Sequence, residues 1–267
     1  MVVNVVPRPS QERGNANHGW LKSFHTFSFA SYFDDKHEKF GCLRVINEDR
    51  VEPTTGFGTH GHREFEIFSY VVSGQLEHAD SMGNTEVLSR GDLQMTSAGT
   101  GIRHSEKCHG PRQVHFIQIW SLPNKSGLAP SYYTRRFSDE EKQNKWVRVV
   151  APVNAEGVSE ARDASGPAPV HSNLSLYATL LSPSTSLQHV FPTGGSGGPK
   201  KSYIHVIQTS GYNPQKPQGA RIKVVGAEAP VELREGDGAY IMGEAGKDIK
   251  VENVGETVAE ILLFDVE

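Results

Sequence analysis

The chain has 267 residues with a formal net charge of −4, and its 36% hydrophobic and 22% charged residues, with 27 glycines and 15 prolines, are typical of a turn-rich globular protein. Its 27 basic and 31 acidic residues include no basic run, which disfavours direct binding to nucleic acid. No segment reaches the roughly 18 apolar residues of a membrane helix, and the N-terminus lacks a secretion-signal pattern. With only two cysteines, Cys42 and Cys108, we expect a soluble, intracellular protein with unpaired thiols.

Strand-like segments separated by glycine-containing turns occupy the first half of the chain. They are GCLRVINEDRV, EFEIFSYVVSG, EVLSRGDLQMTSAG and VHFIQIWSL. This spacing predicts an antiparallel sandwich or barrel and not an alternation of strands and helices. After these segments, Ser138 precedes Asp139, Glu140 and Glu141, a pattern that predicts the capped start of a short surface helix.

A connection between two domains is predicted over residues 151–170, which are rich in small residues and poor in apolar ones. The second half then repeats the strand-and-turn style. One echo is specific, because SRGDLQMTSAG at 89–99 and REGDGAYIMGEAG at 234–246 share a Gly-Asp turn followed by a similar run. We therefore predict an all-β protein of two tandem β-barrels, over residues 1–150 and 171–267.

The strongest local motif is GFGTHGHREFEIF at residues 56–68, which contains His60 and His62. Side chains alternate between the faces of a strand, so these two imidazoles point the same way and can bind one ion. A single His-x-His pattern also arises by chance, and the alternative is a pair of exposed or core histidines. A second motif is needed to decide between the two.

That second motif is GTGIRHSEKCHG at residues 99–110, where His104 and Glu106 form another same-face pair. Two strands that lie side by side in a barrel would then supply two ligands each. Three imidazoles and one carboxylate suit a divalent transition metal better than calcium or magnesium. Four protein ligands on a six-coordinate ion leave two positions open, which favours metal-assisted chemistry over a purely structural role.

Two further acids compete for the role of the carboxylate ligand. Glu64 and Glu66 share the parity of His60 and His62 if the strand stays regular, and the alternative for Glu66 is a carboxylate that supports the metal ligands without binding the ion, or a salt-bridged acid. Residues alone leave this choice open. Gln118 and Trp120 are candidates for lining a pocket, although an aromatic residue in a β-core is the simpler interpretation. Five other histidines are interpreted mainly as surface or packing residues: His18, His25, His78, His109 and His115.

The first half of the chain resembles the pirin family of the cupin superfamily. The segments that carry the resemblance are RGNANHGWLKSFHTFSFASYFDD (13–35), FGCLRVINEDRV (40–51), GFGTHGHREFEIFSYVVSGQLEHADSMGN (56–84) and GDLQMTSAGTGIRHSEK (91–107). The resemblance implies a double cupin with metal in the N-terminal barrel only. It also implies His60, His62, His104 and Glu106 as the ligands, which selects Glu106 over Glu66, and Fe(II) as the expected ion, with another divalent transition metal as the alternative.

One position departs from the family pattern, because Gly61 stands where the pirin motif has proline between the two histidines. Glycine loosens a strand, so metal affinity is the property that this change puts in question. The second half has His171, His189 and His205 but no His-x-His paired with a His-x-Glu, and its barrel is expected to be metal-free.

The resemblance also implies a function. It predicts a quercetin 2,3-dioxygenase that acts on a small aromatic, flavonol-like substrate, with Glu106 as both metal ligand and catalytic base. The alternative is an iron-dependent transcriptional co-regulator or redox-sensing binding protein without turnover, with a protein partner and a nuclear as well as cytoplasmic location. A third alternative is a scaffold that the metal merely stabilises.

Overall fold

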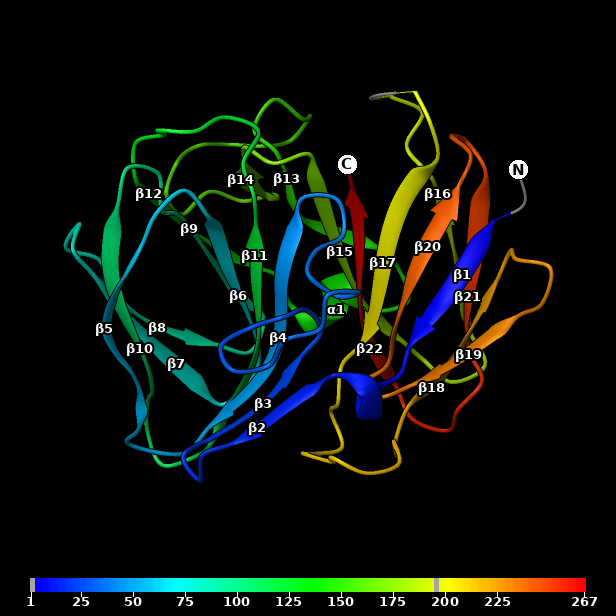
Figure 1. The fold of residues 1–267 in the computed structure, drawn as a ribbon, viewed down its shortest axis with the longest axis horizontal. Helices are drawn as coiled ribbons and strands as arrows, with labels where there is room; N and C mark the ends of the chain where they lie inside the picture. Colours follow the sequence, from blue (N-terminus) through cyan, green and yellow to red (C-terminus); the bar gives the residue numbers. More distant parts are fainter. Residues whose placement is uncertain (1–2, 195–196) are drawn as a thin grey trace. The chain divides into compact units, whose positions relative to one another are not determined.

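The computed structural model describes residues 3–194 and 197–267, and almost every regular element within them is a strand (Figure 1). Contacts divide the chain into two compact units. We call them the N-terminal barrel (Gly14–Phe137 and Val149–Asn173) and the C-terminal barrel (Met1–Arg13, Ser138–Arg148 and Leu174–Glu267). Among the described residues, no helix has the length and apolar character needed to cross a membrane. Both cysteines are buried, and within the described residues neither forms a disulfide, as predicted.

The N-terminal barrel contains a seven-stranded sheet with the order β12-β9-β6-β11-β4-β3-β2. Its strands are β2 (Gly14–Asn17), β3 (Leu21–His25), β4 (Leu43–Val51), β6 (Glu66–Ser73), β9 (Asp92–Ser97), β11 (Val114–Ser121) and β12 (Ser131–Arg136). A four-stranded sheet with the order β5-β10-β7-β8 completes the barrel. Its strands are β5 (Gly56–His62), β7 (Gln75–Asp80), β8 (Thr85–Ser89) and β10 (Ile102–Cys108).

Both sheets of the N-terminal barrel contribute to one core. Val71 and Phe116 come from the larger sheet, Leu76 and Leu88 come from the smaller one, and all four are at most 3% exposed. Alternating apolar side chains place one face of each strand inward, and each fully buried aliphatic or phenyl side chain contributes roughly 1.5–3 kcal/mol. This shared core holds β5 and β10 beside the larger sheet.

The C-terminal barrel is built in the same way, with one sheet containing β1-β20-β17-β22-β15 and a four-stranded sheet β16-β21-β18-β19. The first set is β1 (Asn4–Arg8), β15 (Leu174–Leu181), β17 (Lys200–Val206), β20 (Gly238–Gly243) and β22 (Ala259–Val266). The second set is β16 (Ser186–Val190), β18 (Arg221–Val225), β19 (Val231–Arg234) and β21 (Asp248–Asn253). An apolar core lies between the two sets, and the prediction of an all-β, two-barrel protein is confirmed.

The repeated Gly-Asp motif forms the same turn in both barrels. Gly91 joins β8 to β9 with φ 87°, and Gly236 joins β19 to β20 with φ 83°. The aspartate after each glycine accepts the backbone N–H three residues before it, from Ser89 to Asp92 and from Arg234 to Asp237, each at 2.8 Å. Glycine is required there because a side chain disfavours positive φ.

The units differ from the predicted boundaries at 1–150, 151–170 and 171–267. The segment predicted as a connection folds onto the N-terminal barrel, where β13 (Val147–Pro152) and β14 (Ala168–Val170) form a parallel pair and Arg162 O accepts from Thr134 N at 2.8 Å. Backbone hydrogen bonds hold this apolar-poor segment, and composition does not reveal them. Conversely, β1 pairs with β20 of the C-terminal barrel.

The predicted short helix is present as α1 (Asp139–Lys142) in the C-terminal barrel. Ser138 caps it by accepting from Glu141 N at 3.2 Å, while the Glu141 carboxylate accepts from Ser138 N at 2.7 Å. The reciprocal pair satisfies two backbone donors that have no partner within a helix.

Candidate metal centre

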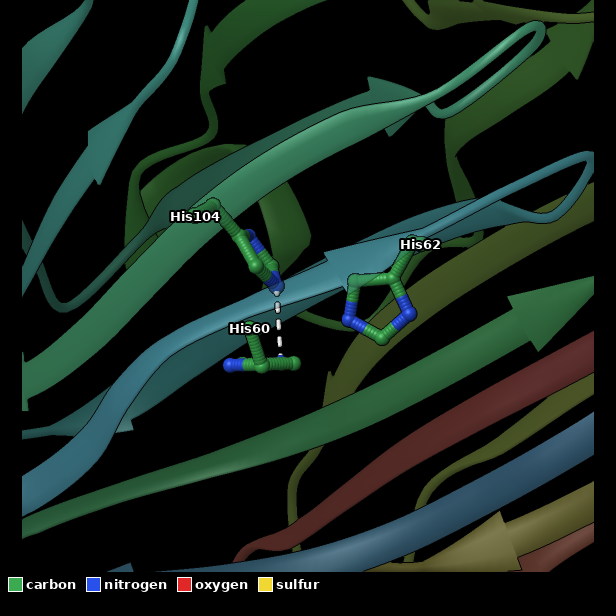
Figure 2. A group of neighbouring side chains, drawn as sticks. All are labelled: His60, His62 and His104. Carbon is green, nitrogen blue, oxygen red and sulfur yellow. Dashed lines mark hydrogen bonds between the residues drawn. The ribbon is translucent and has the colours of Figure 1, made fainter.

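Three imidazoles meet on the neighbouring strands β5 and β10. His60 pairs directly with His104 across the ladder, and His62 lies two residues further along β5. The ring centroids of the three side chains are 4.7, 4.7 and 4.8 Å apart (Figure 2). One ligand atom from each ring lies within 4.8 Å of the others, so the cluster could hold a metal ion. The prediction that these histidines converge is confirmed.

A bulge in β5 shapes this cluster. His104 and Glu106 are separated by one residue, whereas their partners His60 and Phe57 are separated by two. The extra residue falls at Gly58 and Thr59, where glycine tolerates the local distortion. The His60 Nδ1 atom lies 2.8 Å from Gly58 O, so Nδ1 carries the proton and Nε2 is free to bind an ion.

The spacing of the nitrogens fits a first-row transition metal. His60 Nε2 and His104 Nε2 are 3.2 Å apart. Two ligands that each lie about 2.1 Å from an ion are roughly 3.0–3.4 Å apart at octahedral or tetrahedral angles. His104 is 1% exposed, and its Nδ1 has no hydrogen-bond partner within residues 3–194 and 197–267. The donor set, nitrogen only at this point, suits a divalent transition metal.

Burial and mutual repulsion favour the neutral forms of His62 and His104. Desolvation, then the charges of His104 and His60, lower the pKa of His62 to about 4, while Glu106 opposes the shift. Desolvation also lowers the pKa of His104, again against the effect of Glu106. Neutral imidazole is the form that binds a metal, so the folded chain presents its ligands ready for an ion.

This shift makes the stability of the metal-free protein sensitive to pH. Because the pKa of His62 is near 4 when folded and near its ordinary 6.5 when unfolded, the unfolded chain binds more protons between these values. We expect the free energy of unfolding to fall as pH is lowered from 7 to 5, and to fall less in His62→Gln. Urea unfolding at both pH values measures this, with the exposed His109→Gln as control. Identical pH dependence in wild type and His62→Gln would contradict the assignment.

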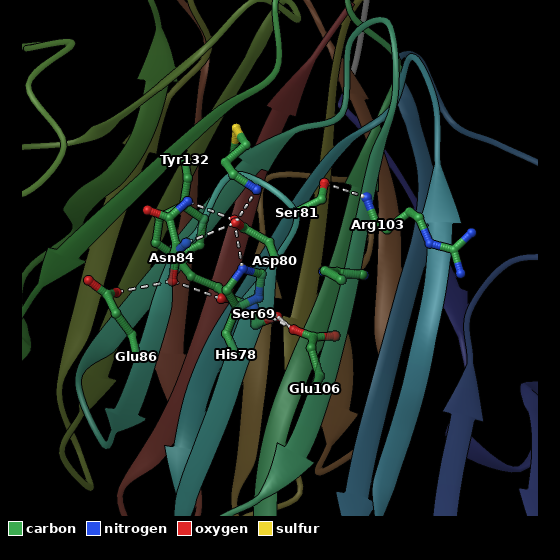
Figure 3. Close-up of polar contacts among 12 residues, drawn as sticks. Ser69, His78, Asp80, Ser81, Asn84, Glu86, Arg103, Glu106 and Tyr132 are labelled. Carbon is green, nitrogen blue, oxygen red and sulfur yellow. Dashed lines mark hydrogen bonds and ion pairs between the residues drawn. The ribbon is translucent and has the colours of Figure 1, made fainter.

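Glu106 lies next to the cluster but is not one of its converging ligand atoms. It is 1% exposed, and its carboxylate accepts from Ser69 Oγ at 2.8 Å (Figure 3). It also accepts from Gln118 Nε2 at 2.8 Å and, through a short hydrogen bond, from Gln94 Nε2. These three contacts fix the orientation of the carboxylate within the barrel, but none of them is to a histidine of the cluster. Its place as the fourth ligand therefore stays a prediction.

Two hollows border the cluster. A small pocket of about 70 Å³ is lined by His60, Glu106, Gln118 and Trp120, together with residues of β3 and β4. An open cleft of about 490 Å³ lies at His62, between Arg63 and Arg103. Gln118 and Trp120 thus line a pocket, where the simpler interpretation had placed an aromatic residue in the β-core, and Trp120 packs edge-on against His62 with centroids 4.8 Å apart.

Several residues at the centre were missed by sequence reasoning. Ser69 and Gln94 were not singled out, although they are polar residues in otherwise apolar buried strands, which is a usable signal. His25 was interpreted as a surface or packing residue, but it lines the small pocket beside His60 and Glu106. Its Nδ1 lies 2.9 Å from Asn47 Oδ1. His78 is a packing residue, as predicted, stacked on Tyr132.

Neither competing acid joins the histidines. β5 ends at His62, and Glu64 has φ 64°, so the strand parity that would have aligned Glu64 and Glu66 with the ligands is broken. Glu66 is 0% exposed and accepts from Ser172 Oγ at 2.6 Å and from His171 N at 2.8 Å. Glu66 is therefore held by partners of its own, with His171 Nδ1 at 3.3 Å, and burial raises the pKa of its carboxyl group.

Glu66 is expected to stabilise the N-terminal barrel, because its carboxylate binds residues at the end of the segment Val149–Asn173. Glu66→Ala would leave His171 N and Ser172 Oγ without their acceptor, and hydrogen bonds to charged groups are worth about 1.5–3 kcal/mol each. We expect the free energy of unfolding to drop by about 2–4 kcal/mol in urea titrations. Glu64→Ala, which removes only a contact to Gly127 N, should cost below ~1 kcal/mol. Equal losses for both variants would refute this role.

The fold and the cluster define a protein of two cupin-type barrels, one of which carries a candidate centre for a divalent metal. The family model "Pirin" matches residues 7–121. The chain is 38% identical over 261 residues to the quercetin 2,3-dioxygenase of Escherichia coli strain K12, covering 97% of each, and 36% identical to a pirin-like protein of Caulobacter vibrioides over 81% of this chain and 89% of the other. The chain belongs to the pirin family.

Solved structures agree with this assignment. The chain is similar to YhhW from Escherichia coli with a TM-score of 0.81 and 34% identity, covering 99% of this chain and 98% of that one. It is also similar to the bacterial pirin YhhW from Escherichia coli in complex with nickel(II), with a TM-score of 0.80 and 34% identity over 98% of this chain and 99% of that one. A cupin-type double barrel is therefore the fold of this chain.

Proposed function

We propose that this chain is a metal-dependent dioxygenase of the quercetin 2,3-dioxygenase type. The observation that carries the proposal is the cluster of His60, His62 and His104 beside the buried carboxylate of Glu106. The names of its relatives, which include quercetin 2,3-dioxygenase, support the same reaction class. The chemistry requires a Lewis acid and a base close together, and this part of the barrel supplies places for both.

The three histidines and Glu106 would hold the ion. We infer Fe(II) as the natural ion, with nickel(II) or another divalent transition metal as the alternative, since nitrogen and carboxylate ligands suit several of them. The nickel(II) complex of YhhW shows that a relative binds such an ion. When bound, the ion supplies Lewis acidity and redox chemistry.

Glu106 is the proton acceptor in this proposal. Its Oε1 accepts from both Ser69 and Gln94, whereas its Oε2 accepts only from Gln118 among the described residues. Oε2 therefore keeps one lone pair, which can either bind the ion or take and hold the proton of a flavonol hydroxyl group. The resulting flavonolate is the electron-rich form that reacts with dioxygen.

The two hollows set how the substrate would lie. Small-molecule sites usually measure about 300–1,000 Å³, so a cavity of about 70 Å³ cannot enclose a flavonol. The open cleft of about 490 Å³ at His62 has the necessary volume. We place the reacting ring at the histidines and the remaining rings in this cleft. Trp120 and Phe57, which line the small pocket beside His60, would keep water from the reacting ring.

Oxygen consumption by the iron-loaded protein tests the proposal. Adding quercetin should start oxygen uptake and release of carbon monoxide in equal amounts, and the metal-free protein should show neither. Nickel(II)-loaded protein, assayed in parallel, tests the alternative ion. A protein that binds the ion but leaves quercetin unchanged would contradict the proposal and favour the regulatory alternative, in which ferrous and ferric forms bind partners differently.

A further inference from the structure

The carboxylate of Glu106 sits at the end of a buried chain of polar side chains. Gln94 Nε2 donates to Glu106 Oε1 and, at 2.9 Å, to Ser69 Oγ. Gln118 Nε2 donates to Glu106 Oε2 at 2.8 Å. Ser69 and Gln94 are at most 1% exposed and Gln118 is 8% exposed, so water does not compete for these contacts. The four side chains lie on four different strands, β6, β9, β10 and β11.

The orientation of the Gln94 amide follows from these contacts. Both hydrogens of its nitrogen have acceptors, in Ser69 and Glu106, and its oxygen lies 3.1 Å from Tyr132 Oη. A flipped amide would place its oxygen against the Glu106 carboxylate, which is repulsive. Burial, then Glu86, raise the pKa of Tyr132, so its hydroxyl group stays a donor.

The chain continues from Tyr132 towards the surface. Tyr132 Oη lies 3.0 Å from Glu86 Oε2 (Figure 3). Glu86 also forms an ion pair with Arg162. The Arg162 guanidinium also lies 5.5 Å from the centre of the Tyr132 ring. One hydroxyl hydrogen can serve only one acceptor, so Arg162 favours the contact to Gln94 by neutralising the competing Glu86.

We propose that Gln94, oriented by Tyr132, is a positioning residue that holds the Glu106 carboxylate with Oε2 turned towards the histidines. The inference rests on the proposed role of Glu106 as ligand and base. Gln94 Nε2 and Ser69 Oγ both lie within hydrogen-bond distance of Oε1, so Oε1 is occupied and Oε2 is the oxygen left to face an ion. Partners that orient metal ligands typically change metal affinity by 10–100-fold when they are removed.

Cobalt(II) binding tests this without any turnover. Gln94→Met keeps the length of the side chain and removes both donors. We expect it to weaken Co(II) binding by about 10–100-fold and to change the visible absorption of the Co(II) form, because the carboxylate ligand is no longer aimed at the ion. Gln113→Met is the matched control, since Gln113 Nε2 donates to Glu52 Oε1 at 2.7 Å in the same barrel. Its affinity and spectrum should match wild type.

A second variant, Tyr132→Phe, tests the same proposal if Gln94→Met does not fold. Tyr132→Phe keeps the ring stacked on His78, with centroids 4.6 Å apart, and removes only the hydroxyl group. We expect a smaller loss of Co(II) affinity, about 2–10-fold, with the same spectral change. The thermal midpoint of each metal-free variant shows that it is folded. Wild-type affinity and spectrum in folded Gln94→Met, or in Tyr132→Phe if the first does not fold, overturns the proposal.

The outcomes separate this inference from the proposed function. If flavonol oxidation is absent but Co(II) binding falls in Gln94→Met, the positioning role holds and the dioxygenase fails. If oxidation is present and Co(II) binding is unchanged in folded Gln94→Met, only the positioning role fails.

Discussion

Replacing His104 by alanine is expected to lower the affinity of the chain for nickel(II) by at least roughly 100-fold, the largest effect of any single histidine at the centre. His104 is the buried member of the cluster, and its Nε2 lies 3.2 Å from that of His60. Its loss removes the one imidazole of the three that β10 supplies. His60 and His62, both on β5, would remain as ligands. Isothermal titration with nickel(II) measures the change.

His109→Ala is the matched control for this experiment. His109 follows β10 and pairs with Glu77 at 3.0 Å on the surface, with 44% of its side chain exposed. Its removal should leave nickel(II) affinity unchanged. If His104→Ala binds nickel(II) as tightly as wild type, the centre at His60, His62 and His104 does not exist.

The second large effect is expected for Glu106→Gln, which should lower the rate of flavonol oxygenation by about 100–10,000-fold. An amide cannot accept a proton at neutral pH. The new amide nitrogen would also face the donors of Ser69, Gln94 or Gln118, so part of the network around it must break. Initial rates of oxygen uptake with quercetin measure the loss.

Glu77→Gln on the neighbouring strand β7 provides the control, because this acid lies at the surface beside His109 and outside the cluster. Its rate should stay within about twofold of wild type. Metal content is measured in both variants. A Glu106→Gln protein that carries a full complement of metal and oxidises quercetin at the wild-type rate would remove Glu106 from the mechanism.

Part of the histidine cluster was predictable because side chains alternate between the two faces of a strand. His60 and His62 share a strand face through simple alternation, and His104 lies on the strand that pairs with theirs. The same alternation made Glu64 and Glu66 candidate ligands, but it does not extend to them, because β5 ends at His62 and the backbone at Glu64 has φ 64°. Periodicity predicts side-chain direction only while the strand continues.

The sequence by itself determined the all-β class, the two similar barrels, the capped helix at Ser138 and the shared strand face of His60 and His62. These follow from patterns of a few residues, in which burial and turn chemistry act locally. Only the tertiary structure decided which residues hold Glu106 and Glu66, because their partners lie 12–37 and 105–106 residues away along the chain. Such contacts arise when sheet pairing and core packing bring distant strands together, and no local pattern encodes them.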